Sequence, residues 1–552
     1  MAKARDPFMD LHFPKAGLSV EGPLSKQPAR PMANKQYART AAAGVNVRTY
    51  EPSSNRDRGG SRPGLAKYHP ALVSELLGGT DEWVIQNLAV ISNMGVLPPG
   101  GSSVQTSQQG RVVSILAVSQ GVVKVAQPGD LTWSTPTNLT GNTPPLNFDG
   151  LLFSTNLNQK QFFVDGTNYV YWDPTDNSVN TWTPTDGLLP VDVSSNTARL
   201  CCTWRGRMVL SGLFKDPQNW FMSRKDDPFD WEYGADDNDV TQAVAGNNSP
   251  AGTVGDVVNS FVPYTDDVLI FGGDSTLWLM QGDPMYGGQI DRLSDSIGMA
   301  FGRPWCKDPF GAVYFFSSRN SIFRLVPGKE LTRVSGPIQR LLDDIDTGNT
   351  SITMAWDERA QGFHTFITPL QRGSDTLPQE TIHYFFESRA GAWWQDKFTS
   401  PYHNPLCCAV MDGNEPADRV VIAGGWDGYV RSIDRDAETD DGRKIASSVL
   451  IGPILTSDMD DMLLKNVQAV MAAESGDVEY EVLVADTAEE ALSCEPVSTG
   501  KWSAGRNPTD FVRMAGYAIY IRLRSTNRWA MESIRAEITS RGKVRMRDRL
   551  GR

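Results

Sequence analysis

The sequence predicts an all-β chain built around a β-propeller of about seven blades, with six or eight also possible. Three observations lead to this prediction: a repeated hairpin pattern, its regular spacing, and a change to longer alternating strands near residue 446. The predicted parts are an extended basic N-terminal arm, a propeller-like repeat domain, a C-terminal antiparallel β-sandwich and a basic tail. Their boundaries are 1–68, 69–445, 446–540 and 541–552.

The repeated pattern is an apolar run, a small polar turn and a second apolar run that carries an aromatic residue. Gly, Asn, Asp and Ser at the centre supply the positive-φ or side-chain-capped conformations that a tight turn needs. The alternation gives each hairpin one apolar face, which a single hairpin cannot bury, so the units must stack against one another. The pattern occurs at Phe162–Trp172, Leu269–Met280, Tyr314–Leu325 and Val421–Ile433.

The turn centres recur at 45 to 62 residues, except for one gap of 108 residues that holds two units. The segment 354–394 supplies the unit inside that gap, with turns at 358–362 and 388–391. Repeats of this length rich in short strands are typical of four-stranded propeller blades. The alternative is a set of unrelated hairpins in an ordinary sandwich. The turn centres are Gln120, Asp165, Gly212, Asp274, Arg319 and Asp427.

Helical signals are few. A Ser cap, an early Pro and apolar residues at helical spacing predict a helix over 335–345. A second short helix is expected within 69–92. After residue 446, strands are expected at 449–455, 467–473, 478–485, 517–524 and 530–538.

The composition favours a soluble protein without disulfides. No stretch approaches the ~18 apolar residues of a membrane span. Six cysteines, including the adjacent pairs Cys201–Cys202 and Cys407–Cys408, fit a reducing compartment. Adjacent residues of a strand point to opposite faces, so these pairs are better read as small buried hydrophobes than as metal ligands.

Charge is unevenly distributed along the chain. Residues 1–68 carry 12 basic against 5 acidic residues, and residues 541–552 carry 6 against 1, while the whole chain has a net charge of −13. The remaining residues, 69–540, therefore carry a net charge of −25. A basic arm and tail on an acidic body are typical of interaction segments, although disordered solubilising ends are the alternative.

The arm contains the densest short motif, a Gly-rich and Arg-rich loop within 45–68. Its arginines offer bidentate contacts to carboxylate or phosphate, and its glycines permit close backbone approach. We expect this segment to dock on a neighbouring molecule. The predicted docking residues are Arg48, Arg56, Arg58, Gly59, Gly60 and Arg62.

The sequence contains no recognisable catalytic motif. The five histidines are not spaced as metal ligands, and no phosphate-binding loop occurs. The acidic clusters 236–239 and 343–346 lack the register of a calcium loop, so solvated turns are the preferred interpretation. Neither catalytic residues, cofactor nor metal is therefore predicted, although a propeller glycoside hydrolase using paired carboxylates is a further alternative.

Four strings resemble virion structural proteins of tailed bacteriophages, in particular the nozzle or tubular tail proteins of short-tailed phages. The resemblance spans roughly residues 45–540 and lies in structural turns and packing aromatics. The strings are 45–68, 207–234, 282–298 and 305–316.

The resemblance implies a non-enzymatic virion component, assembled in the host cytoplasm into a homo-oligomeric ring commonly of about six copies. Such a ring would sit below the portal and adaptor, contact other tail proteins and form a channel through which viral DNA passes without sequence-specific binding. In such a ring, residues 1–68 would extend onto a neighbouring subunit or the adaptor, so that a chain lacking residues 1–65 folds as a monomer but forms no ring. An acidic wall suits that passage, because a basic one would retain phosphates. A host-surface-binding tail or baseplate component is the alternative. It would use an exposed aromatic patch of Trp220, Phe229, Trp231 and Tyr233.

Overall fold

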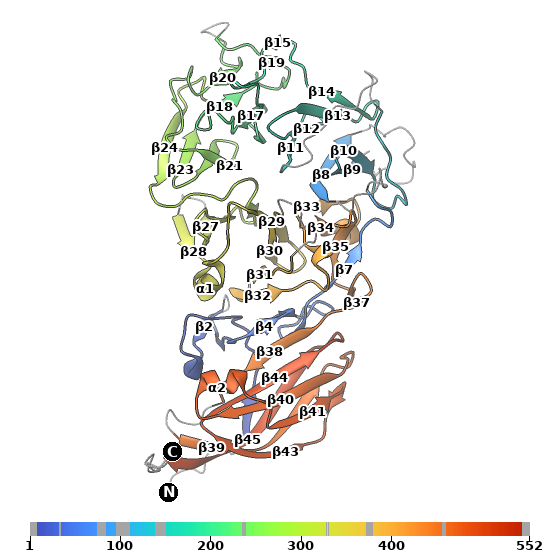
Figure 1. The fold of residues 1–552 in the computed structure, drawn as a ribbon, viewed down its shortest axis with the longest axis vertical. Coiled ribbons are helices and arrows are strands. Elements are labelled where there is room, and N and C mark those ends of the chain that lie inside the picture. Colours follow the sequence, from blue (N-terminus) through green and yellow to red (C-terminus); the bar gives the residue numbers. More distant parts are fainter. Residues whose placement is uncertain are drawn as a thin grey trace.

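The computed structural model describes residues 8–32, 35–73, 84–94, 111–137, 151–234, 239–326, 328, 330–370, 379–454 and 460–543. Over these residues the chain is all-β, as predicted. Its strands form an upper unit of small sheets around a centre and a lower unit of larger sheets, as Figure 1 shows. No helix in this part of the chain is long and apolar enough to cross a membrane.

The upper unit is a succession of antiparallel sheets in chain order, in which each strand pairs with the next. The first two sheets are β8 (Ile85–Met94), β9 (Arg111–Ser119) and β10 (Val122–Ala126), then β11 (Phe153–Leu157), β12 (Lys160–Val164), β13 (Tyr169–Asp173) and β14 (Ser178–Thr181). The next two are β16 (Leu200–Trp204), β17 (Arg207–Ser211), β18 (Trp220–Met222) and β20 (Val244–Ala245), then β21 (Val258–Thr265), β22 (Val268–Gly273), β23 (Leu277–Gln281) and β24 (Gln289–Ser294).

Three further sheets complete the unit. They are β25 (Trp305–Lys307), β26 (Val313–Phe316), β27 (Ile322–Val326) and β28 (Glu330–Arg333); β29 (Thr350–Asp357), β30 (Gly362–Pro369), β31 (His383–Glu387) and β32 (Ala392–Asp396); and β33 (Cys407–Asp412), β34 (Arg419–Gly424) and β35 (Val430–Asp434). The four hairpins predicted from the repeated pattern are confirmed as β12–β13, β22–β23, β26–β27 and β34–β35.

The first strands of these sheets lie around a common centre. β33 contacts β8, β8 contacts β11, β11 contacts β16 and β16 contacts β21, while β25 contacts β29 and β29 contacts β33. A backbone bridge from Ser260 to Gly302 links β21 to the segment before β25. Each pair of neighbouring sheets also shares buried apolar side chains: Phe163 and Trp172 pack against the first sheet, and Met411 and Ile422 close the ring from the other side. Burial between the sheets explains why a single hairpin pattern repeats.

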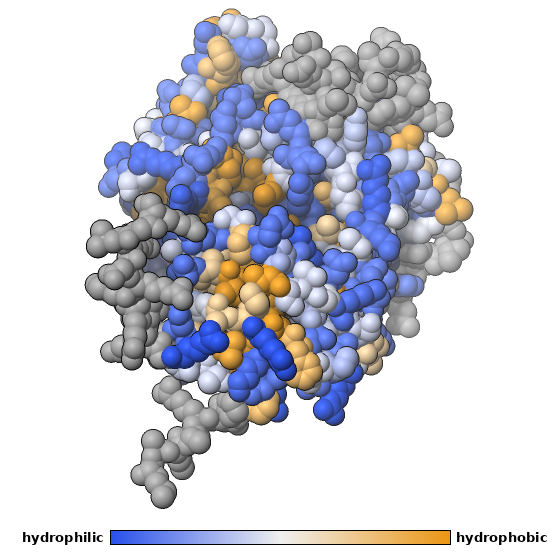
Figure 2. Space-filling model, turned by 60° about the horizontal axis from the view of Figure 1, so that its bottom comes forward, coloured by the Kyte–Doolittle hydropathy of each residue, from blue (hydrophilic) through white to orange (hydrophobic). Residues whose placement is uncertain are grey.

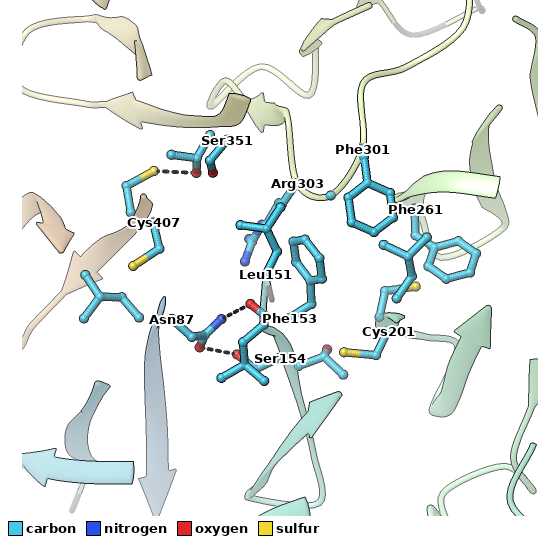
Figure 3. Close-up of a pocket in the computed structure, with 18 of the residues that line it drawn as sticks. Asn87, Leu151, Phe153, Ser154, Cys201, Phe261, Phe301, Arg303, Ser351 and Cys407 are labelled. Atoms are coloured by element: carbon cyan, nitrogen blue, oxygen red, sulfur yellow. Dashed lines mark hydrogen bonds between the residues drawn. The ribbon is translucent and has the colours of Figure 1, made fainter. Parts of the chain in front are cut away.

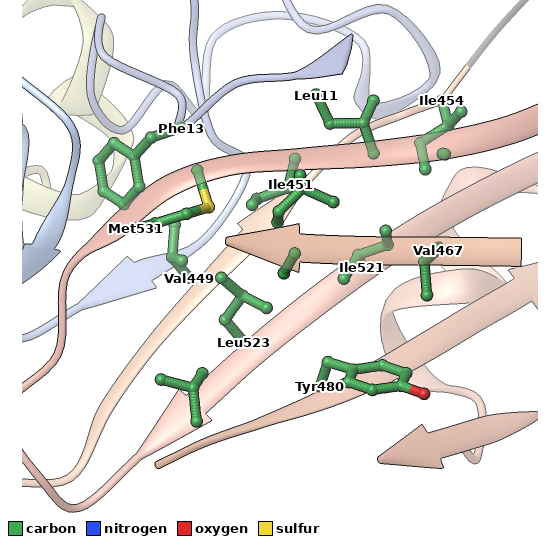
Figure 4. Close-up of a cluster of buried hydrophobic side chains, with 14 of the residues drawn as sticks. Leu11, Phe13, Val449, Ile451, Ile454, Val467, Tyr480, Ile521, Leu523 and Met531 are labelled. Carbon is green, nitrogen blue, oxygen red and sulfur yellow. The ribbon is translucent and has the colours of Figure 1, made fainter. Parts of the chain in front are cut away.

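The lower unit contains two sheets that share one cluster of buried apolar side chains, shown in Figure 4. One sheet has the order β38 (Ser447–Ile451), β44 (Ala518–Ser525), β40 (Val478–Ala485) and β41 (Ser498–Trp502). The other contains β1 (Phe8–Leu11), β45 (Met531–Lys543) and β39 (Asp460–Met471), with β42 (Gly505–Arg506) and β43 (Asp510–Gly516) on β39. Alternating residues of both sheets point into the cluster, as strand geometry requires.

The N-terminal arm supplies strands to both units. β4 (Gly44–Val45) pairs with β32 of the upper unit and β38 of the lower unit, so that one nine-stranded sheet crosses the boundary. β7 (Gly64–Lys67) pairs with β35, and β1 pairs with β45. The arm also contains the small pairs β2 (Ala29–Pro31) with β3 (Tyr37–Arg39) and β5 (Val47–Arg48) with β6 (Gly60–Ser61).

The helix predictions had different outcomes. The helix predicted over 335–345 is present as the turn Gly336–Ile338 and α1 (Gln339–Leu342). The short helix expected within 69–92 is wrong for its second half, because Ile85 begins strand β8, while residues 74–83 lie outside the described part. The apolar residues there are buried against β9 and β33, and this pairing overrides a helical reading of a short apolar run. A further helix, α2 (Ala488–Ser493), begins after the Thr487 cap.

Candidate functional site

Two of the predicted docking arginines are buried in ion pairs within the chain. Arg48 makes a two-pronged contact with Asp396, at 2.7 and 2.6 Å, and its guanidinium lies 4.1 Å from the centre of the Phe385 ring. Burial acts to raise the pKa of Asp396, but Arg48, together with Arg62 and His364, outweighs it, and the net pKa is lowered. The side chains of both partners are 4% exposed, so this pair is sealed between the arm and β32.

Arg62 forms the second buried pair, with Asp440 at 2.9 and 2.6 Å. Its Nε donates to Asn46 Oδ1 at 2.8 Å, which fixes the plane of the guanidinium. Asp440 also accepts hydrogen bonds from the backbone N–H groups of Leu65 and Thr399, at 3.2 and 3.1 Å. A buried charge is tolerated only when it is paired and hydrogen-bonded in this way.

The remaining predicted docking residues surround these pairs. Arg58 contacts Glu51 and Glu532, and so bridges the arm to β45. Gly59 has φ +78°, and a Cβ there would lie 2.1 Å from Phe13. A Cβ on Gly60 would lie 2.4 Å from the Trp529 carbonyl oxygen. Close packing inside the chain therefore accounts for both glycines.

Arg56 is exposed, unlike the other arginines of the motif. The structure thus brings the motif together, but against β32, β36 (Thr439–Asp440) and β45 of the same chain. Docking of these residues on another subunit stays a prediction, and for Arg48 and Arg62 it would require breaking buried pairs. Sequence reasoning did not find the partners Asp396 and Asp440, because no local signal marks an acid hundreds of residues from its arginine.

The predicted exposed aromatic patch is wrong for its two tryptophans. Trp220 and Trp231 are both fully buried, and their indole N–H groups donate to the carbonyl oxygens of Gly252 and Pro228, at 3.0 and 2.8 Å. Phe229 and Tyr233 are half-buried against the cluster that contains Trp231. Aromatic residues bury large areas, and here they fill the space between sheets instead of facing a ligand.

The acidic clusters and the thiols carry no metal site among the described residues. Asp346 caps its own turn by accepting from Gly348 N and Asn349 Nδ2, at 3.0 and 2.7 Å. Asp236 and Asp237 lie outside the described residues. All six cysteines are free in the structure.

The centre of the upper unit holds two adjoining cavities, of about 240 and 430 Å³. Residues from the first strands of every sheet of this unit, or from the turns that lead into them, line these cavities. Figure 3 shows the smaller cavity, with Phe153, Phe261 and Phe301 on one side and Cys407 on the other. The two cavities therefore lie where the first strands of the sheets converge, and no single loop forms them.

Polar side chains around the smaller cavity are held by short hydrogen bonds. Asn87 donates to the Leu152 carbonyl oxygen and accepts from Ser154 Oγ, both at 2.9 Å. Thr353 Oγ1 lies 3.1 Å from Cys408 Sγ. Burial raises the pKa of Cys408 to about 11, so its thiol is neutral at pH 7 and adds no negative charge to the wall.

Arg303 stands between the two cavities and lines both. Its guanidinium lies 5.1 Å from the centre of the Trp305 ring, and no carboxylate of the described residues lies within 4.0 Å of it. Lys307, which lines only the larger cavity, is held by the carbonyl oxygens of Pro263 and Tyr264. Desolvation lowers the pKa of Lys307. Sequence reasoning missed this cavity, because its lining is drawn from separate turns with no shared motif.

The lower end of the molecule presents apolar rings beside arginines. Phe8 and Phe511 are 47% and 70% exposed, and the guanidiniums of Arg535 and Arg513 lie 5.6 and 5.7 Å from their ring centres. Figure 2 shows this end, where apolar and strongly polar side chains alternate. The surface is therefore mixed in character.

Comparisons with known proteins define no family for this chain. No family model matches, and no curated protein matches. Many solved structures are similar, and the following three, all at low identity, are among them. Virginiamycin B lyase from Staphylococcus aureus has 11% identity and a TM-score of 0.37, covering 63% of this chain and 99% of that one.

The extracellular domain of the putative hybrid two component system BT4673 from B. thetaiotaomicron has 10% identity and a TM-score of 0.43, covering 87% of this chain and 57% of that one. YCF48 bound to D1 peptide has 11% identity and a TM-score of 0.36, covering 67% and 99%. Likenesses of this strength carry no argument about function.

Proposed function

We propose that the upper unit is a seven-bladed propeller and the lower unit a β-sandwich. The contacts between successive first strands, and the apolar clusters shared by neighbouring sheets, support the first assignment. The single cluster between the two lower sheets supports the second. In the last blade, the outer strand β7 comes from the N-terminal arm, so the ring is closed by a strand from the opposite end of the chain.

We further propose that the chain is a non-enzymatic structural component of a phage tail. It would form a nozzle-like ring, commonly of about six copies, below the portal and adaptor, around the channel through which viral DNA leaves. The phage resemblance of the sequence suggests this role. The observation that carries it is the way the arm fastens the two units into one body.

The fastening has three parts. Strand β4 bridges β32 and β38, so backbone hydrogen bonds run without a break from a blade into the lower unit. The buried pairs of Arg48 and Arg62 lock the arm to Asp396 and Asp440. A body stiffened across its boundary suits a part that must keep its shape in an assembly, whereas domains joined by a small polar interface move relative to one another.

Charge supports the same role. The chain outside its two basic ends carries −25, which would keep an exit channel from holding DNA phosphates. The alternative of a host-surface-binding protein loses its main support, because Trp220 and Trp231 are buried. No observation in the described residues favours a hydrolase over the structural role.

The proposal is tested by electron micrographs of the purified full-length protein, alone and mixed with portal and adaptor proteins of a short-tailed phage. Rings of defined symmetry, or a chain that joins the portal–adaptor assembly, would support it. A chain that stays monomeric under both conditions, and that binds cells or degrades polysaccharide, would overturn it. The deletion of residues 1–65 is a poor test, because it removes β1 to β6 and the first half of β7, and it leaves Asp396 and Asp440 buried without partners.

A further inference from the structure

The inner wall of the upper unit contrasts in charge with the rest of the chain. The chain has a net charge of −13, yet the described residues that line the two central cavities include Arg303 and Lys307 and no Asp or Glu. The thiols there are neutral at pH 7, because burial raises the pKa of Cys201, Cys407 and Cys408. The recess is thus locally positive within an acidic protein.

Arg303 is the group that a ligand would meet. It lies in the short segment between the fourth and fifth sheets, next to Gly302, whose φ is +102°. Its side chain is exposed to the cavity and lacks a carboxylate within 4.0 Å among the described residues, whereas Arg48 and Arg62 are fully paired. Lys307 differs, since two backbone carbonyl oxygens already hold it.

The side chains beside Arg303 could pack against the apolar part of a ligand. Phe153 and Phe301 meet edge to face, with ring centres 5.6 Å apart, and Phe261 lines the same side. On the opposite side, Asn87, Ser154 and Thr353 offer polar groups already fixed by hydrogen bonds. The wall therefore combines apolar rings with polar groups in fixed positions, and small-molecule sites use both kinds of contact.

From these observations we propose that the central cavity binds a small organic anion, with its carboxylate on the Arg303 guanidinium and a flat apolar body against Phe153, Phe261 and Phe301. A guanidinium offers a carboxylate a two-pronged, charge-assisted contact. The volume of about 240 Å³ favours a ligand of one ring over a larger one. This site does not depend on the proposed tail function.

The test uses the full-length protein and two probes of equal shape, benzoate and its neutral amide benzamide, at constant ionic strength. Binding is measured by isothermal titration calorimetry. We expect saturable binding of benzoate, at least about tenfold tighter than benzamide. Equal affinities for the two probes, or no saturable binding of benzoate, would overturn the proposal.

Substitutions of Arg303 test whether benzoate binds in the central cavity. Arg303→Gln should weaken benzoate binding by about tenfold or more and leave benzamide unchanged, while Arg303→Lys should retain part of the benzoate affinity. The matched control is Arg292→Gln, because Arg292 is also exposed beside a tryptophan, 4.5 Å from the Trp278 ring centre, but lies outside both cavities. Equal losses in Arg303→Gln and Arg292→Gln would mean that benzoate binds elsewhere, and would overturn the assignment.

Discussion

The blades and the N-terminal arm are both built of short strands, but they are paired in opposite ways. In a blade, each strand pairs with its neighbour in the chain, as Phe162 does with Tyr171. In the arm, Phe8 pairs with Glu537 and Leu65 with Ile433. The blades are therefore assembled from local contacts, whereas the arm, apart from its small pairs β2–β3 and β5–β6, is held by residues hundreds of positions away. This difference predicts that damage to the arm affects both units, while damage to one exposed blade position stays local.

The largest effect is expected from breaking a buried pair of the arm. Arg62→Ala leaves Asp440, which is fully buried, without its charge partner, and we expect a loss of about 3–5 kcal/mol in the free energy of unfolding. The measurement is the urea unfolding midpoint followed by tryptophan fluorescence.

The matched control for that prediction is Arg292→Ala, which removes an exposed pair with Asp295 in a blade. Surface pairs contribute about 0–1 kcal/mol, so the control should scarcely move the midpoint. Equal shifts for the two variants would contradict the contrast between arm and blade. The double variant Arg62→Met with Asp440→Leu should recover much of the loss, because it leaves no buried charge.

The next effect is a pH dependence at His383, a blade residue that lies near the arm. Its Nδ1 accepts from Ile367 N and its Nε2 lies 3.0 Å from Asn404 Oδ1, so protonation would place a proton facing the Ile367 N–H. Burial, with a further contribution from the charge of Arg62, lowers the pKa of His383 from 6.5 to about 4.

The sign follows from the lowered pKa. Between pH 6.5 and 4 the unfolded chain binds a proton that the folded chain does not, so stability falls as the pH falls through this window. The loss from this one group is at most about 3 kcal/mol. Unfolding free energies measured at several pH values should show this slope, and His383→Gln should flatten it. An unchanged slope in the variant would contradict the assignment to His383.

The sequence predicts the blades well because their signal is local. The hairpin from Phe162 to Trp172 is set by alternation and a polar turn, and both are visible within a dozen residues. The central cavity and the arm could not be predicted in the same way. Arg303 is recognised as part of a cavity only once the folded chain brings several separate turns together. The sequence around Arg62 does not distinguish it from an exposed arginine, because its partner Asp440 lies far away in the chain. The error at Trp220 has the same origin, since an aromatic residue near a turn has no mark that distinguishes blade packing from a surface patch.

Two glycines separate the cost of backbone conformation from the cost of packing. Gly59 of the arm and Gly391 of a blade turn both have positive φ, +78° and +63°, but a Cβ on Gly391 meets nothing within 4 Å, while one on Gly59 would lie 2.1 Å from Phe13. Gly391→Ala should therefore cost only the strain of a left-handed backbone, about 1 kcal/mol. Gly59→Ala should cost about 1–3 kcal/mol more, because Phe13 must move within the core that it shares with Trp394 and Trp529. Urea midpoints of the two variants measure the difference directly. Equal losses of unfolding free energy in the two variants would mean that Phe13 moves aside easily. The contacts of the arm would then be looser than those between the blades.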